Sequence, residues 1–154
     1  MATTNYTGKL VDLLIFRGAA AEGEKQVALT LNNYVTTGIQ KLLQSFAVLF
    51  LTERGSVTHY PDLGTDFVTA VRQGSIRDEA DVQDQFLVAV EYVRQTLSLE
   101  AEQNEMPADE QFQSAALKSF EIDRTSSTLR MYVVVTSVAG QAREIFLPVP
   151  LAIQ

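Results

Sequence analysis

Three acidic residues and the only histidine surround a loop that could carry chemistry. Glu53, Asp62 and Asp66 flank this loop, and His59 lies within it. A glycosidase needs two carboxylates about 5–9.5 Å apart, and an imidazole can act as a general base near neutral pH. The simpler interpretation places Glu53 and Asp66 at helix ends and leaves Asp62 and His59 as solvated loop residues. No further residue completes a catalytic set, so we expect that the chain is not an enzyme.

Other catalytic and ligand-binding motifs are missing from the sequence. The absence of cysteine and the single histidine exclude disulfides, thiolate metal sites, cysteine nucleophiles and multi-histidine sites. Asp78, Asp81 and Asp84 share one helical face, but they do not form a calcium-binding loop. The glycine-rich phosphate-binding motifs and the G-x-S-x-G nucleophile motif are also absent. We therefore expect no cofactor and no metal ion.

Composition and charge indicate one acidic globular domain. The 154 residues are 46% hydrophobic and 20% charged, enough for a core without disulfides. Twelve Lys and Arg against 19 Asp and Glu give a net charge of −7, and the basic residues are scattered, which argues against nucleic acid and anionic membranes as partners. The start lacks a signal-peptide pattern, and no apolar run approaches the roughly 20 residues that span a bilayer. We expect a soluble chain made in a cytoplasm.

Hydrophobic periodicity predicts helices over residues 37–52, 65–73 and 79–103. The second half of the first helix also has apolar residues on its other side, which predicts burial nearly all round. Thr36 or Thr37 can cap this helix and Gly55 can end it. The apolar stripes contain Ile39, Leu42, Leu43, Phe46 and Phe50 in the first helix and Val82, Phe86, Ala89, Val90, Val93 and Leu97 in the third.

Alternating apolar residues predict strands over 114–123, 127–138 and 142–149. Pro148 and Pro150 cannot donate hydrogen bonds, so the last strand should lie at a sheet edge. We predict an α+β fold with the helices packed on one face of a mostly antiparallel sheet that ends in a β-hairpin.

Residues 1–35 precede this pattern and form either an N-terminal arm or a β-hairpin, with strand-like stretches at 9–16 and 25–31. Residues 36–154 then make up the α+β domain.

A distinctive turn pattern joins the first two predicted helices. The sequence reads L-T-E-R-G, a short loop, and P-D-L-G-T-D-F, with Thr65 placed to cap the second helix. Glycines at both ends of the loop and a proline within it predict a rigid corner that fixes the two helices at a set angle. The residues that carry the pattern are Leu51, Thr52, Gly55, Pro61, Gly64, Thr65 and Phe67.

This pattern, L-T-x-x-G…P-x-x-G-T-x-[FL], resembles the baseplate wedge family of contractile phage tails. The family is named for the gene 25 product of phage T4, carries the label "lysozyme-like", and is related to the baseplate subunit of type VI secretion systems. The resemblance extends more loosely over about residues 36–149. It implies a structural virion protein of the tail baseplate that is assembled in the host cytoplasm.

The resemblance also implies partners and contact surfaces. Such a subunit joins other wedge proteins and initiates the tail sheath, with the tail tube or hub as a further candidate partner, in about six copies arranged in a ring. Sheath subunits join by exchanging strands, so the hairpin at 127–149 is the expected sheath-docking edge. Its residues are Tyr132, Val134, Thr136, Glu144 and Phe146.

The chain departs from the family after its long helix. The family often carries an acid-Pro-Arg motif there that contacts the wedge core, whereas residues 107–111 here contain no arginine. Either Arg124 takes the place of that arginine in space, or the contact is built differently. The expected wedge-core contact consists of Glu105, Asp109, Glu110 and Arg124.

Two alternative functions stay open on the sequence. The first is a peptidoglycan-cleaving tail lysozyme that uses Glu53 with Asp62 or Asp66. The second is an adaptor protein of another tail or neck ring.

Overall fold

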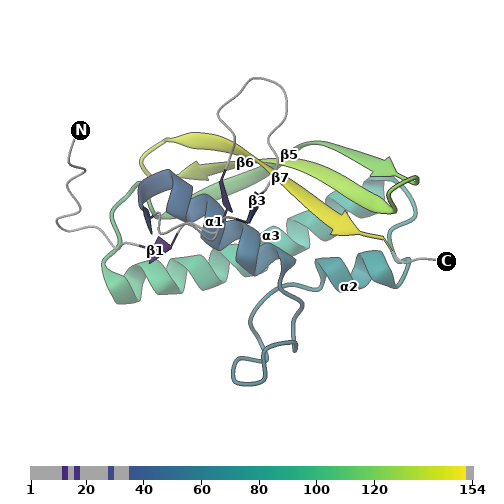
Figure 1. Cartoon of the computed structure of the whole chain (residues 1–154). Helices are drawn as coiled ribbons and strands as arrows, with labels where there is room; N and C mark the ends of the chain where they lie inside the picture. Colours follow the sequence, from purple (N-terminus) through teal and green to yellow (C-terminus); the bar gives the residue numbers. More distant parts are fainter. Residues whose placement is uncertain (1–11, 14–15, 18–27, 30–34, 152–154) are drawn as a thin grey trace.

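Three helices pack against one antiparallel sheet, which confirms the predicted α+β fold (Figure 1). This computed structural model describes residues 12–13, 16–17, 28–29 and 35–151. The helices are α1 (Gly38–Leu51), α2 (Phe67–Arg72) and α3 (Glu79–Asn104). The sheet consists of β5 (Phe112–Asp123), β6 (Thr128–Ser137) and β7 (Ala142–Pro150).

Four short strands precede the first helix and form two antiparallel pairs. Strand β1 (Asp12–Leu13) pairs with β4 (Val35–Thr36), and β2 (Phe16–Arg17) pairs with β3 (Ala28–Leu29). The pairing agrees with a predicted hairpin. The rest of the expected strands at 9–16 and 25–31 lies outside the described residues.

The ends of α1 differ from the sequence prediction. Thr37 occupies the N-cap position but makes no side-chain cap hydrogen bond; instead the Glu110 carboxylate accepts the Gly38 N–H at 2.9 Å. The helix ends before Gly55, because Thr52 turns to an extended conformation with φ −75° and ψ 124°. Its N–H and its hydroxyl both still donate to the Val48 carbonyl.

The burial of α1 also departs from the prediction at one position. Ala47, Leu49 and Phe50 are buried, but the Val48 side chain is 41% exposed. This half of the helix is therefore buried nearly all round, as predicted, and Val48 is the exposed exception.

The start of α3 carries a reciprocal cap. The Asp78 carboxylate accepts the Asp81 N–H at 2.9 Å, and the Asp81 carboxylate accepts the Arg77 N–H at 2.9 Å. One of the N–H groups that a helix leaves unpaired, that of Asp81, is thereby satisfied, and the second bond holds the residue that precedes the N-cap against the first turn. The predicted stripe of this helix is buried at Val82, Phe86, Ala89, Val93 and Leu97.

Stacked phenylalanine rings join the helices to the sheet. Phe46 of α1 stacks on Phe112 of β5 with ring centroids 5.9 Å apart and on Phe50 at 5.6 Å. Phe50 in turn contacts Phe67 of α2 at 4.9 Å and Phe86 of α3 at 5.6 Å. The Phe50 side chain of α1 therefore contacts both other helices. Aromatic pairs of this kind stabilise a fold beyond the effect of their buried area.

Strand β6 is the centre of the sheet and β7 forms one edge. The pairing sets Arg130 opposite Pro148 and Thr128 opposite Pro150, so the prediction that the prolines mark an edge strand is confirmed. Inward-facing residues of β6 are buried in strict alternation, from Leu129 to Val135. The helices thus cover one face of the sheet, as the alternation predicts.

The reciprocal cap yields a prediction about stability. Asp78→Ala should lower the free energy of unfolding by about 1 kcal/mol, because the Asp81 N–H loses its acceptor. Asp84 is an exposed acid on the same helix that takes no part in the cap. Asp84→Ala should therefore change the free energy of unfolding by less than about 0.5 kcal/mol. Urea denaturation of both variants measures the difference; equal effects would show that the cap contributes nothing.

Candidate functional site

The corner between α1 and α2 is closed by backbone hydrogen bonds. The Thr65 N–H donates to the Thr52 carbonyl at 2.8 Å, and the Arg54 N–H donates to the Thr65 carbonyl at 3.1 Å. Across the loop, the Gly55 N–H donates to the Pro61 carbonyl at 2.8 Å. The loop extends away from the helices and sheet (Figure 1), yet its two ends are held side by side.

Two residues make this closure possible. Gly64 has φ +97°, and a Cβ at this position would overlap the carbonyl oxygen of Thr52. Thr65 is fully buried and donates its hydroxyl to the Phe50 carbonyl at 2.7 Å, while the same oxygen accepts the Phe67 N–H at 3.4 Å. Asp66 occupies the N-cap position that the sequence assigned to Thr65.

The motif residues therefore converge in space as one corner. Phe67 is buried against Phe50, and Gly55 adopts φ +81° in the turn that follows α1. The structure brings together six of the seven positions that carry the sequence pattern: Thr52, Gly55, Pro61, Gly64, Thr65 and Phe67.

The candidate catalytic acids near this corner are engaged in ion pairs. Glu53 lies 2.6 Å from Arg72, and Asp66 lies 3.5 Å from Arg54. The Arg54 guanidinium is centred 3.8 Å from the Tyr92 ring, and a hydrogen bond to Tyr92, with nearby acids adding to it, raises the pKa of Arg54. These contacts fasten the corner to α2 and α3.

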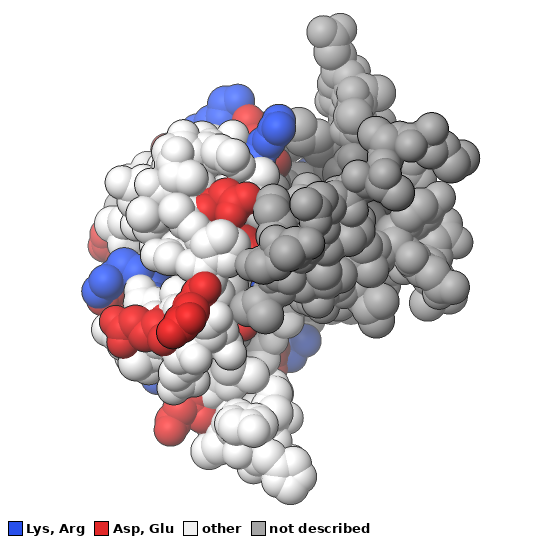
Figure 2. Space-filling model, turned by 90° about the vertical axis from the view of Figure 1, so that its left-hand side faces the viewer, with Lys and Arg blue, Asp and Glu red and all other residues white. Residues whose placement is uncertain are grey.

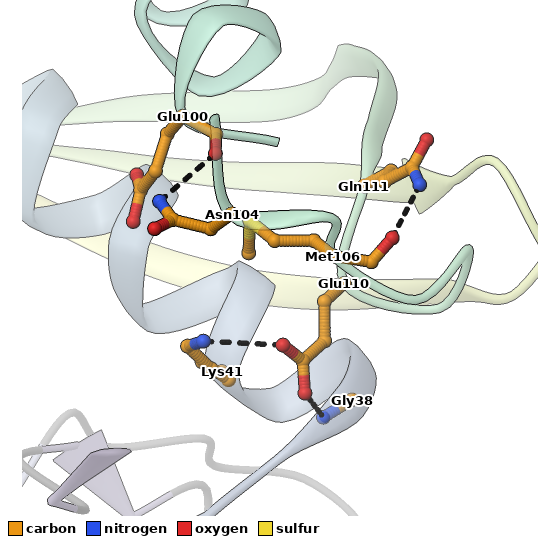
Figure 3. A network of polar contacts seen from close by, with 7 residues as sticks. All are labelled: Gly38, Lys41, Glu100, Asn104, Met106, Glu110 and Gln111. Carbon is orange, nitrogen blue, oxygen red and sulfur yellow. Dashed lines mark hydrogen bonds and ion pairs between the residues drawn. The ribbon is translucent and has the colours of Figure 1, made fainter. Parts of the chain in front are cut away.

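The segment between α3 and β5 contains a buried ion pair, drawn in Figure 3. The Glu110 carboxylate accepts from Lys41 Nζ at 3.1 Å with one oxygen and from the Gly38 N–H at 2.9 Å with the other. The side chains of Lys41 and Glu110 are 8% and 0% exposed. Glu110 was expected at a surface contact with the wedge core. That expectation was wrong, because its carboxylate is buried and already bonded to Lys41 and Gly38.

Other members of the expected wedge-core contact are separated. Glu105 is exposed and Asp109 is partly exposed beside the start of α1, so both lie near the end of α3. Arg124 follows β5, and a strand of 12 residues spans roughly 40 Å. Arg124 therefore cannot substitute for an arginine beside Asp109, and that part of the expectation was wrong.

The expected docking edge is divided between two strands. Tyr132, Val134 and Thr136 lie on central strand β6, whose backbone is paired on both sides, so they were wrongly placed at an edge. They belong instead to the outer sheet face, where Tyr132 lies 5.3 Å from Phe146 between ring centroids. Glu144 and Phe146 do lie on edge strand β7.

The outer edge of β7 faces away from β6. In an antiparallel pair, alternate residues turn their N–H and C=O groups toward the partner strand. Pro148 and Pro150 have no N–H to donate, so they occupy positions whose N–H would point away from β6. The other even-numbered residues of β7 have the same orientation. Ala142, Glu144 and Phe146 therefore direct their N–H groups outward, and no described strand pairs with them.

Sequence reasoning missed Lys41 and Gly38 as parts of the buried network. Lys41 lies on the side of α1 opposite the apolar stripe, because it follows Ile39 by two residues, so helical spacing gave no signal of a buried partner. The identity of that partner, 69 residues away, has no local signature.

Comparisons with known proteins give no match: no family model, no curated protein and no solved structure matches the chain. Among the described residues, no group of His, Asp and Glu could hold a metal ion. In the same part of the chain, no helix has the length and apolarity needed to cross a membrane.

The corner geometry predicts different sensitivities at two glycines. Gly64 and Gly74 both have positive φ, but only at Gly64 would a Cβ meet the backbone. Gly74→Ala should lower the free energy of unfolding by about 1 kcal/mol, because of its backbone conformation alone. Gly64→Ala should lower it by on the order of 3 kcal/mol or more, because the new Cβ also meets the backbone. Thermal and urea unfolding test this ranking, which equal losses would refute.

The buried ion pair gives a second stability prediction. Lys41→Met keeps the aliphatic stem but leaves the Glu110 carboxylate buried and unpaired, so the free energy of unfolding should fall by about 3–5 kcal/mol. Lys118→Met breaks the exposed pair with Glu144, 2.6 Å apart, and should cost less than about 1 kcal/mol. Urea unfolding of both variants compares them directly; a small loss for Lys41→Met would contradict the role of the pair.

Proposed function

We propose that this protein is a structural, non-enzymatic subunit of a contractile phage tail baseplate wedge that joins the wedge core and initiates sheath assembly. The observation that carries the proposal is the corner motif between α1 and α2. Its glycines, proline and threonine occur in the order of the wedge family, and each has a structural task in closing the loop.

The edge of β7 supports the sheath-docking part of the proposal. A strand of a sheath subunit could pair along this edge, where Ala142 and Phe146 direct N–H groups away from β6. Pro148 and Pro150 would stop such pairing at one end and so set its register. The other edge, β5, carries register shifts between Phe112 and Ser114 and between Leu117 and Ser119, which make it a poorer template.

The carboxylates near the corner favour the structural reading over a lysozyme. Glu53 and Asp66 are held by Arg72 and Arg54, so they brace the corner. Measurable hydrolysis of purified cell wall that is lost in Glu53→Gln would overturn the non-enzymatic proposal.

Quantitative peptide mass spectrometry of virions from the encoding phage tests the assignment. A copy number near six per particle, in fractions that contain the baseplate, would support a wedge subunit. Absence from the particle, or co-purification with neck components, would exclude it.

A proline variant tests the docking edge. Glu144→Pro removes an outward N–H while leaving the bonds between β6 and β7 in place, so the protein should fold but sheath assembly should fall strongly. Glu144→Gln removes the pair with Lys118 and keeps the N–H, and should assemble normally. Electron microscopy of sheathed tails, with wild-type or variant protein supplied to a deletion phage, gives the readout. Normal tails with a folded Glu144→Pro variant would refute the docking edge.

A further inference from the structure

A groove runs along the surface between the corner loop, α1 and α3. Two hollows of about 390 Å³ and 250 Å³ adjoin, because both are lined by Leu63 and Thr96. We call them together the corner groove. Its main lining residues are Val48, Leu49, Tyr60, Leu63, Thr96 and Glu100.

The groove offers apolar contact area on a fixed framework. Val48 is 41% exposed and Tyr60 is 69% exposed, although both belong to hydrogen-bonded backbone. The Tyr60 N–H donates to the Val57 carbonyl and the Leu63 N–H to the Tyr60 carbonyl, each at 3.0 Å. A wall that is already organised loses little conformational entropy on binding, and exposed tyrosines are frequent anchors of interfaces.

The charge around the groove is acidic. Asp62 lines one hollow and Glu100 the other. Two basic side chains of α1 and the corner are already engaged, because Lys41 is buried with Glu110 and Arg54 is held over Tyr92. Figure 2, which faces the end of the molecule where α3 terminates, shows several groups of acidic side chains on the described surface.

Acidic residues are concentrated at the C-terminal end of α3. Carboxylates near a helix C-terminus are disfavoured by the negative end of the helix dipole, which basic residues usually offset. Glu100, Glu102 and Glu105 lie at the end of α3, and its last turn contains no basic residue. A cationic partner at this end would relieve the unfavourable charge, whereas an acidic one would add to it.

We propose that the corner groove binds a basic amphipathic segment of a partner protein. Apolar side chains of that segment pack on Val48, Leu63 and Tyr60, and its lysines or arginines contact Glu100 and Asp62. This surface is distinct from the edge of β7, so the inference does not rest on sheath docking.

Two synthetic peptides test the proposal on the full chain. The first is an amphipathic helix with leucines on one face and lysines on the other, and the second replaces the lysines by glutamates. Fluorescence anisotropy should detect saturable binding of the lysine peptide, weakened by salt, and at least about tenfold weaker binding of the glutamate peptide. NMR chemical-shift changes should map to the corner groove. No binding, equal binding of both peptides, or shifts confined to the sheet would overturn the proposal.

Matched variants separate the groove from general charge and hydrophobicity. Val48→Asp and Glu100→Lys should each weaken lysine-peptide binding about tenfold or more. Leu87→Asp changes another exposed apolar residue, 62% exposed on α3. Glu102→Lys makes the same charge change at the same helix end but lines a different hollow. Both controls should bind within about threefold of wild type.

Equal losses in variants and controls would refute the site. A dimer of the chain that Val48→Asp abolishes would assign the groove to a second copy and also overturn the proposal.

Discussion

A buried carboxylate fixes the relation between the first helix and the sheet. Burying a charge is costly unless it is paired and hydrogen-bonded, and Glu110 meets both conditions through Lys41 and the first N–H of α1. Because Glu110 immediately precedes β5, these bonds lock the start of α1 to the start of that strand. The phenylalanine stack then continues from β5 through Phe46 to Phe50. Polar and apolar contacts therefore hold α1 in one orientation across the sheet.

The corner extends the same constraint from the end of α1. The close approach of Gly64 to Thr52 lets Thr65 return to the helix end, where its hydroxyl binds the Phe50 carbonyl. Phe67 then enters the core against Phe50. A loop that extends from the body can thus be rigid at its base, because its two ends are bonded to each other and to one buried ring.

Local periodicity explains which parts of the fold are predictable. The stripes of α1 and α3 and the alternation of β6 follow directly from residue spacing, and the two prolines mark β7 as an edge. Alternation identifies the two faces of a strand but not its neighbours, so Tyr132 was assigned to an edge although β6 is central. Glu110 was expected at a contact with the wedge core, and its burial instead depends on a lysine far away in sequence. Within the candidate site, the corner was therefore accessible to sequence reasoning, whereas the buried pair and the groove were not.

The edge strand and the corner are mechanically connected. Both α1 and α2 contact β7 from beneath the sheet, and the corner joins these two helices directly. A partner strand added to β7 would extend the sheet on which both helices rest, so its orientation would be fixed relative to the corner. The described connection between them consists of a capped helix, stacked rings and a bonded loop base, with no glycine-rich hinge between β7 and α1. Two surfaces held in this way have a fixed relative orientation in the structure, and the proposed place in a symmetric ring would use that orientation.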